Sequence, residues 1–285
     1  MRSITRSRKT HGGQRTVSGL VRACHPGPTV VVTGISMALA TAVGRDAAGI
    51  ALVAVTVLVG QLSIGWSNDW LDARRDAASG RRDKPVATGD IAVPVVRLAA
   101  VSALVLCIPL SFFNGFGAGW AHLGLVGSGW AYNAGLKRTL LSWVPYAVGF
   151  GLLPAFVTLG LPGAPWPTWW ATASASLLAV GAHFANVLPD IDDDLAHGVN
   201  GLPQRLGTRW AGTLAICMLL AASALLLLNA GGGPAPVIGA VTVGLLSAVG
   251  LVSVRQAANL PRTFFCAMAI AAVDVLVFVG VAGAR

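Results

Sequence analysis

The sequence predicts an all-α integral membrane protein with nine transmembrane helices, and three observations support this fold class. The chain has 285 residues, of which 55% are hydrophobic and 11% are charged, whereas a soluble domain carries about a quarter charged residues. Its mean hydropathy is +0.71. Its apolar runs are continuous and approach the length of about 20 residues that a membrane-spanning helix needs, unlike the shorter alternating segments of a membrane β-barrel.

Nine apolar segments follow a basic N-terminal stretch. Residues 1–24 are rich in Arg and lack the apolar core of a signal peptide, so we expect a cytosolic tail. Residues 25–285 are expected to form one transmembrane domain. Each of the following segments should form one helix: 26–44, 47–66, 91–113, 117–134, 143–161, 168–188, 210–229, 234–254 and 263–283.

The distribution of basic residues predicts the orientation. With nine helices and a cytosolic N-terminus, every Lys and Arg except Arg45 and Arg285 falls on the cytosolic side, as the positive-inside rule requires. We therefore expect a multi-pass protein of the cell membrane. The net charge of +9 is explained by this topology and by anionic lipid. No nucleic acid partner is expected, because aromatic residues are not interleaved with the basic ones.

The acidic residues are concentrated in two places. Glu is absent, and all Asp residues except Asp46 and Asp274 lie in or directly after two motifs at the cytosolic ends of the second and sixth segments. Residues four apart share one face of a helix, so each motif predicts a stripe of oxygen ligands. The stripes are Asn68, Asp72 and Asp76, and Asn186, Asp190 and Asp194.

Two such stripes facing each other indicate that the protein binds a divalent cation. Carboxylate and amide oxygens bind Mg²⁺, which is often shared with substrate phosphates, so the stripes predict a Mg²⁺–diphosphate site. Nearby cations can bind the remaining phosphate oxygens, and the apolar bundle can hold an isoprenoid chain. Metal ions and cations on a leaving diphosphate promote ionisation of the allylic C–O bond.

At these residues the chain resembles the UbiA superfamily of intramembrane prenyltransferases. Asn68, Asp69, Asp72 and Asp76 match the first signature of that superfamily, NDxxDxxxD, and Asp190 and Asp194 match the second, DxxxD. The resemblance extends over about residues 20–285. It implies a nine-helix bundle whose central cavity opens near the cytosolic side, dependence on Mg²⁺, a prenyl diphosphate donor, and a small-molecule acceptor that is often aromatic.

The resemblance and the position of the residues together predict roles for individual side chains. Lys84 stands where the family often has Arg, and Asn133 stands where it often has Tyr, with Tyr132 one position away. Tyr132 and His183 are candidates for the acceptor side, since His183 precedes Asn186 by one helical turn. The catalytic candidates are Asp72, Asp190 and Lys137. The expected metal ligands are Asn68, Asp69, Asp72, Asp76, Asn186, Asp190 and Asp194. The expected diphosphate ligands are Asn68, Arg82, Lys84, Lys137, Arg138 and Arg205.

The predicted reaction is transfer of a prenyl group to an aromatic or quinone-precursor-like acceptor within the membrane. A terpene cyclase, in which a distal double bond of the donor attacks the cation, needs the same diphosphate site and remains the alternative. A cation transporter would need polar residues through the full depth of the membrane. Of the acidic residues in the apolar segments only Asp274 lies deep, which disfavours a transporter.

Overall fold

The chain is a bundle of long helices. The computed structural model describes residues 16–230, 234–255 and 260–283, and these residues contain no β-strand. Residues 16–23 are also helical. The helices of 15 residues or more are α2 (Pro26–Ala42), α3 (Ala47–Ala78), α4 (Val93–Phe113), α5 (Phe116–Ala134), α6 (Val144–Thr158), α7 (Trp169–Val187), α9 (Leu202–Asn229), α10 (Pro234–Val254) and α11 (Leu260–Gly283).

Each of the nine predicted apolar segments corresponds to one of these long helices in the described part of the chain. Six helical stretches are long and apolar enough to cross a membrane: those in α3, α4, α9, α10 and α11, and the stretch Trp169–Ala196 that begins with α7. Helices α2 and α6 are apolar but shorter. The structure therefore supports an all-α membrane bundle with six candidate spans, and the count of nine spans stays a prediction.

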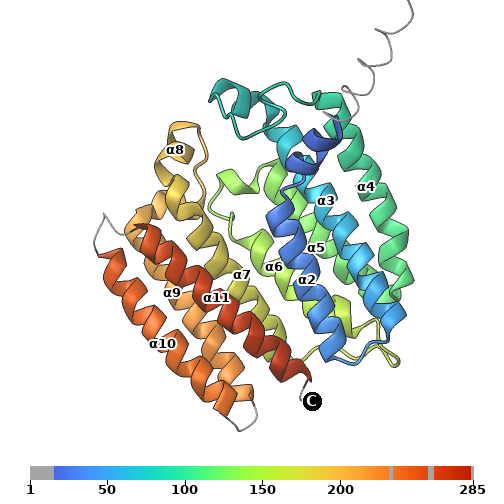
Figure 1. Cartoon of the computed structure of the whole chain (residues 1–285), viewed down its shortest axis with the longest axis vertical. Helices are drawn as coiled ribbons and strands as arrows, with labels where there is room; N and C mark the ends of the chain where they lie inside the picture. The colour runs from blue at the N-terminus through green and yellow to red at the C-terminus, as the bar shows by residue number, and fades with distance from the viewer. Residues whose placement is uncertain (1–15, 231–233, 256–259, 284–285) are drawn as a thin grey trace, which may run out of the picture.

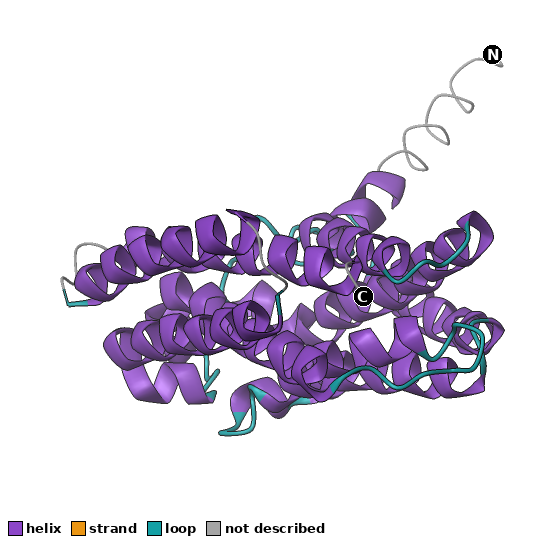
Figure 2. Ribbon diagram, turned by 90° about the horizontal axis from the view of Figure 1, so that it is seen from below, coloured by secondary structure: helices purple, strands orange, loops and turns teal. Residues whose placement is uncertain are grey.

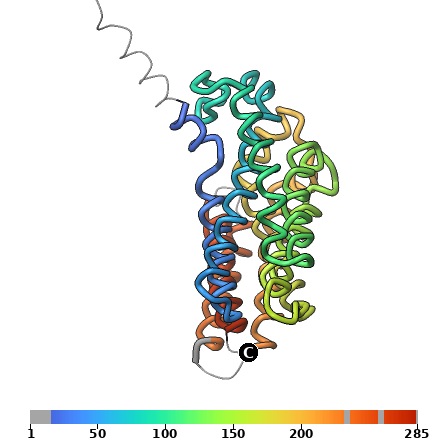
Figure 3. Tube along the Cα trace, turned by 90° about the vertical axis from the view of Figure 1, so that its right-hand side faces the viewer, coloured from blue at the N-terminus to red at the C-terminus, as the bar shows by residue number. Residues whose placement is uncertain are grey.

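The helices form two groups that meet along α7 (Figure 1). Helices α2 to α6 lie on one side of the bundle, and α9, α10 and α11 lie on the other. Seen from below, the helices lie side by side in layers (Figure 2). The long axes of the helices run in nearly one direction (Figure 3). Both acidic motifs lie at the same end of the bundle, because α3 ends there and α8 (Ile191–Ala196) follows α7 there.

The first motif lies on one continuous helix, as predicted. Helix α3 starts at Asp46, whose Oδ1 accepts a hydrogen bond of 2.8 Å from the Gly49 N–H and so caps the helix. The helix continues without interruption to Ala78. It ends next to Gly80, which adopts a φ of 65°, a conformation that glycine adopts without steric penalty. The side chains of Asn68, Asp72 and Asp76 therefore lie along one face of α3.

The second motif does not lie on one continuous helix, so the predicted stripe of Asn186, Asp190 and Asp194 is wrong. Helix α7 ends at Val187, a 3₁₀ turn (η2) covers Leu188–Asp190, and α8 covers Ile191–Ala196. The cause is Pro189, which has no backbone N–H and whose ring clashes with the preceding helical turn. Asp190 accordingly has φ −108° and ψ 2°. The three motif residues therefore lie on three successive elements, α7, η2 and α8.

Helix α9 is bent near its start. Gly207 has φ 75° and ψ 168°, which is not helical, so residues Leu202–Leu206 form a separate turn before the long apolar part of the helix. The apolar segment that the sequence predicts from residue 210 begins just after this bend. The short first turn carries Gln204 and Arg205 next to α8 and the second motif.

Candidate active site

The carboxylates of the first motif are buried and paired with cations. Asp72 and Asp76 are each 2% exposed. Asp72 Oδ2 lies 2.5 Å from Lys137 Nζ and 3.0 Å from Arg75 Nη2. The Arg75 guanidinium also reaches Asp76 Oδ1 at 3.2 Å. Two cations thus balance two carboxylates that burial alone would strongly disfavour.

Lys137 comes from η1 (Leu136–Arg138), the short turn that follows α5. Its side chain is 5% exposed. Burial lowers the pKa of the Lys137 ammonium, and the attraction of Asp72 opposes this shift. A partly desolvated ammonium next to Asp72 is well placed to bind an oxygen of an incoming anion.

Asp69 forms a second ion-pair cluster on the neighbouring face of α3. Its Oδ1 lies 2.7 Å from Lys84 Nζ and 2.8 Å from His25 Nε2. Lys84 Nζ also lies 3.4 Å from Asn68 Oδ1. His25 precedes α2 and has a φ of 54°, a conformation that is uncommon for residues other than glycine. The cluster therefore joins the start of α2 to the end of α3.

Asn68 is oriented by Asn133. The Asn133 amide nitrogen donates to the Ile64 carbonyl at 2.9 Å and to Ser67 Oγ at 2.8 Å. Its carbonyl oxygen is then left to accept from Asn68 Nδ2 at 3.1 Å. This arrangement turns Asn68 Oδ1 toward Lys84. Asn133 stands at the position where the pattern described above often has Tyr. Here its amide sets the orientation of Asn68.

The second motif lies beside the first. Asp194 Oδ2 accepts a hydrogen bond of 2.8 Å from Gln204 Nε2, whereas Asn186 and Asp190 are exposed. The guanidinium of Arg81 interacts with both motifs: its hydrogen bond with Asp83 is the main cause of its raised pKa, and the charges of Asp76 and Asp190 add to it. The two motifs are therefore close enough to act on one cation.

The structure brings some predicted residues together and leaves others at the periphery. Lys84 and Lys137 contact motif carboxylates. Arg82 and Arg138 are exposed, and Arg205 donates from Nε to the Asn200 carbonyl at 2.9 Å. Sequence reasoning missed four residues that contact the motifs. Arg75 and Gln204 lie within the motif contexts, whereas nothing in the sequence pointed to His25 or to a positioning role for Asn133.

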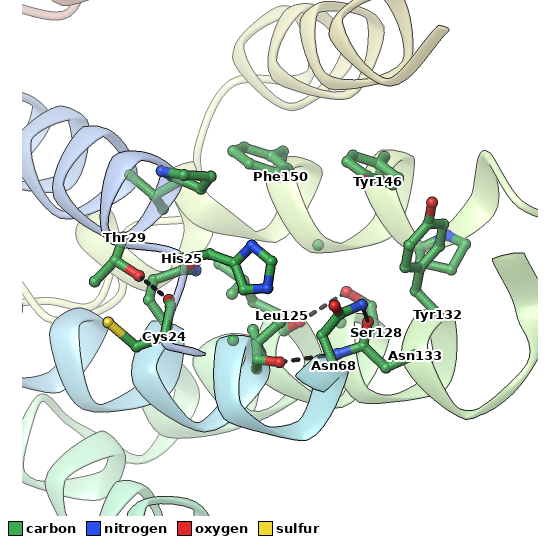
Figure 4. Close-up of a pocket in the computed structure, with 18 residues that line it drawn as sticks. Cys24, His25, Thr29, Asn68, Leu125, Ser128, Tyr132, Asn133, Tyr146 and Phe150 are labelled. Carbon is green, nitrogen blue, oxygen red and sulfur yellow. Dashed lines mark hydrogen bonds between the residues drawn. The ribbon is translucent and has the colours of Figure 1, made fainter. Parts of the chain in front are cut away.

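A cavity of about 260 Å³ lies between α2, α3, α5 and α6, and Asn68 forms part of its wall (Figure 4). Its walls are mainly apolar. Tyr132 and Tyr146 line the upper part, and their rings meet edge to face with centroids 5.2 Å apart. His183 lies behind them, 2% exposed and stacked on Tyr146 at 4.3 Å. The two acceptor-side candidates are thus in one aromatic cluster, with Tyr132 at the cavity surface and His183 behind it.

The donor set fits a Mg²⁺ ion that is shared with a ligand. Within the described residues no three Asp, Glu, His or Cys side chains form a ready metal cluster. Two buried carboxylate oxygens, Asp69 Oδ2 and Asp72 Oδ1, have no hydrogen-bond partner, and such oxygens are costly to leave unsatisfied. Mg²⁺ commonly takes only one or two carboxylates and completes its shell with water and phosphate oxygens. An all-oxygen site of this kind matches these residues.

The protein is thus an all-α bundle of membrane-spanning type, with two acidic motifs at one end and an apolar cavity lined by Asn68 of the first motif. Residues 29–273 match the model of the UbiA prenyltransferase family. The chain therefore belongs to the UbiA prenyltransferase family.

Individual relatives agree with this assignment. The bacteriochlorophyll synthase 33 kDa chain of Cereibacter sphaeroides is 31% identical over 184 residues, which cover 61% of this chain and 60% of that protein. A UbiA homologue from Aeropyrum pernix has the same fold, with a TM-score of 0.69 and 17% identity over 88% of this chain and 96% of its own. A homologue from Archaeoglobus fulgidus, solved with GPP and Mg²⁺, has a TM-score of 0.63 and 15% identity over 91% of this chain and 99% of its own.

Proposed function

We propose that this protein is a Mg²⁺-dependent prenyltransferase, which moves a prenyl group from a prenyl diphosphate to a small-molecule acceptor, aromatic or quinone-precursor-like, within the membrane. The observation that carries this proposal is the position of both acidic motifs at one end of the bundle, where Asn68 of the first motif lines the apolar cavity. Family membership and the GPP and Mg²⁺ bound to the Archaeoglobus fulgidus homologue support it.

The donor diphosphate would lie between the two motifs. Asn68, Asp72 and Asp76 on α3 and Asp190 and Asp194 on the other side would hold Mg²⁺, which neutralises charge on the diphosphate oxygens. Lys137 already lies 2.5 Å from Asp72, so it can bind a diphosphate oxygen without a long movement. The prenyl chain would extend downward into the cavity, past Asn68 and Tyr132.

Side chains of the protein would stabilise the leaving diphosphate and the allylic cation and would exclude water. When the C1–O bond of the donor breaks, its electron pair stays on the diphosphate, and Lys137, Lys84 and Arg75 stabilise the added charge. The resulting allylic cation lies near the faces of Tyr132 and Tyr146, which are suited to cations. The acceptor forms the new bond to C1 and loses a proton, which the released diphosphate can accept. The apolar walls exclude water, which would otherwise trap the cation as an alcohol.

We place this site at the cytosolic face of the cell membrane, with the N-terminus on the same side, because nearly all Lys and Arg residues are then cytosolic. This orientation can be tested separately by labelling single cysteines introduced at Arg82 and Ala164, which lie in connections at opposite ends of α4 to α6, in intact cells.

Product analysis by mass spectrometry tests the function. The purified protein in detergent is given Mg²⁺ and prenyl diphosphates of several lengths, with and without aromatic acceptors. A prenylated acceptor that disappears in the Asp72→Ala and Asp190→Ala variants is the expected result. A terpene formed without any acceptor would instead identify a cyclase, and no consumption or binding of any donor would refute the proposal.

A further inference from the structure

The floor of the central cavity contains one polar side chain, Gln61. The other polar side chains that line the cavity are engaged in hydrogen bonds or, for the two tyrosines, in a ring contact. The Gln61 side chain has no hydrogen-bond partner within the described part of the chain. Its amide is therefore free to interact with whatever fills the cavity. The engaged groups are His25 with Asp69, Thr29 with the Cys24 carbonyl, Ser128 with the Leu125 carbonyl, and Asn133 with the Ile64 carbonyl and Asn68. The rings of Tyr132 and Tyr146 contact each other.

Gln61 lies at the deepest level of the cavity. Each of the four surrounding helices contributes one deepest lining residue: Val32 from α2, Gln61 from α3, Leu125 from α5 and Phe150 from α6. Contacts between neighbouring helices place Gln61, Leu125 and Phe150 at one depth, since a Cβ at Gly149, next to Phe150, would lie 3.7 Å from the Leu125 carbonyl. A Cβ at Gly60, next to Gln61, would touch Val126, next to Leu125. The layer is thus three apolar side chains and one amide.

The depth of this layer below the diphosphate site follows from helix geometry. Gln61 precedes Asn68 by seven residues on the continuous helix α3, which corresponds to about 10.5 Å along the axis. An isoprene unit adds four chain bonds of about 1.5 Å each and advances roughly 5 Å when extended. A chain of about two isoprene units therefore reaches the floor, and a third unit would have to pass the Gln61 amide.

Passing the amide is unfavourable. A prenyl chain offers no hydrogen-bond donor or acceptor, so a chain packed over Gln61 would displace water from the amide and leave it without a partner. An unsatisfied polar group of this kind is costly. A shorter chain ends above the layer and leaves the amide hydrated.

We infer that the Gln61 amide in this layer disfavours longer chains and so selects short donors, of about two isoprene units. The inference rests on the function proposed above and specifies its donor. It assigns to Gln61 a role in donor selection that is independent of the diphosphate site, because the amide lies a full two helical turns below Asn68.

Calorimetric titration of the purified full-length protein with Mg²⁺ and geranyl, farnesyl or geranylgeranyl diphosphate tests this inference without any acceptor. We expect wild type to bind geranyl diphosphate about tenfold or more tightly than either longer donor. Gln61→Met keeps the length of the side chain and removes the amide, so the difference should shrink to within about threefold. Gln61→Leu serves as a second apolar variant if the Met variant does not fold.

Val32→Ala is the matched control, because it enlarges the same layer and keeps the amide. Its preference for the short donor should equal that of wild type. Equal affinity of wild type for all three donors, or an unchanged preference in both Gln61 variants, would overturn the inference. A loss of preference in Val32→Ala alone would show that space, and not the amide, sets the limit. Failure of inorganic diphosphate and of every donor to bind would instead refute the proposed function.

Discussion

Lys137 Nζ lies 2.5 Å from Asp72 Oδ2, although the two residues are 65 positions apart in the chain. The contact joins the turn after α5 to the middle of the first acidic motif on α3. Both side chains are almost fully buried, so each is the main counter-charge of the other. A bound diphosphate would compete with Asp72 for the Lys137 ammonium. Binding of the donor would therefore change the contact between η1 and α3.

The lowered pKa of Lys137 makes donor binding sensitive to alkaline pH. As pH rises through the folded-state pKa, the ammonium loses its charge and diphosphate affinity falls. Over the same interval, up to its usual pKa of about 10.5, the unfolded chain binds more protons than the folded one, so the contribution of Lys137 to the free energy of unfolding rises with pH. Lys137→Arg stays charged, so its affinity should fall less. Diphosphate titrations from neutral pH to about pH 10.5 measure this, and parallel curves for the two proteins would contradict it.

The carboxylates of both motifs should be required for turnover, and their exposed neighbours should not. Asp72→Asn and Asp190→Asn keep the shape of the side chain but remove the charge that would hold Mg²⁺, so we expect turnover to fall by roughly 10²-fold or more. Asp192 lies in the same acidic run and is exposed. Asp192→Asn should stay within about threefold of wild type. Initial rates at saturating Mg²⁺ test this, and equal losses in all three variants would mean that net charge, not position, matters.

Asn133→Leu should weaken metal binding without removing any predicted metal ligand. The substitution leaves Asn68 Nδ2 without its acceptor, so the Asn68 amide is no longer held with its oxygen toward the site. Loss of such an orienting group typically lowers metal affinity by about 10- to 100-fold. Direct titration with Mn²⁺, followed by electron paramagnetic resonance, gives the metal affinity without turnover. Ala134→Leu introduces the same side chain at the next, exposed position and should bind Mn²⁺ as wild type does.

Gly65→Ala should destabilise the protein by displacing the segment before α2. A Cβ at Gly65 would overlap the Cys24 carbonyl oxygen, and that carbonyl belongs to the turn that holds His25 against Asp69. We expect unfolding in detergent at a temperature several degrees lower, consistent with about 1–3 kcal/mol for an overpacked core. Gly34→Ala is the control, because a Cβ there meets no atom. A Gly65→Ala protein as stable as wild type would contradict this, because the segment before α2 would then accommodate the added Cβ without loss of stability.

The sequence by itself determined the helical membrane architecture, the residues of both motifs and the chemistry that they indicate. These features are local: a run of apolar residues forms a helix in lipid because the backbone must satisfy its own hydrogen bonds there. The spacing of Asn68, Asp72 and Asp76 predicts one face of a helix because α3 contains no residue that breaks it. The same spacing failed at Asn186, Asp190 and Asp194, where Pro189 interrupts the helix, although Pro189 is visible in the sequence.

Only the tertiary structure decided which cations meet which carboxylates. Lys137, Lys84 and His25 come from three segments outside α3, and their contacts with Asp72 and Asp69 depend on how those segments pack against the helix. The orientation of Asn68 by Asn133 and the free amide of Gln61 at the cavity floor depend on the same packing. Such contacts join positions far apart in the chain, and a pattern of residues along one chain carries no information on which distant positions will touch.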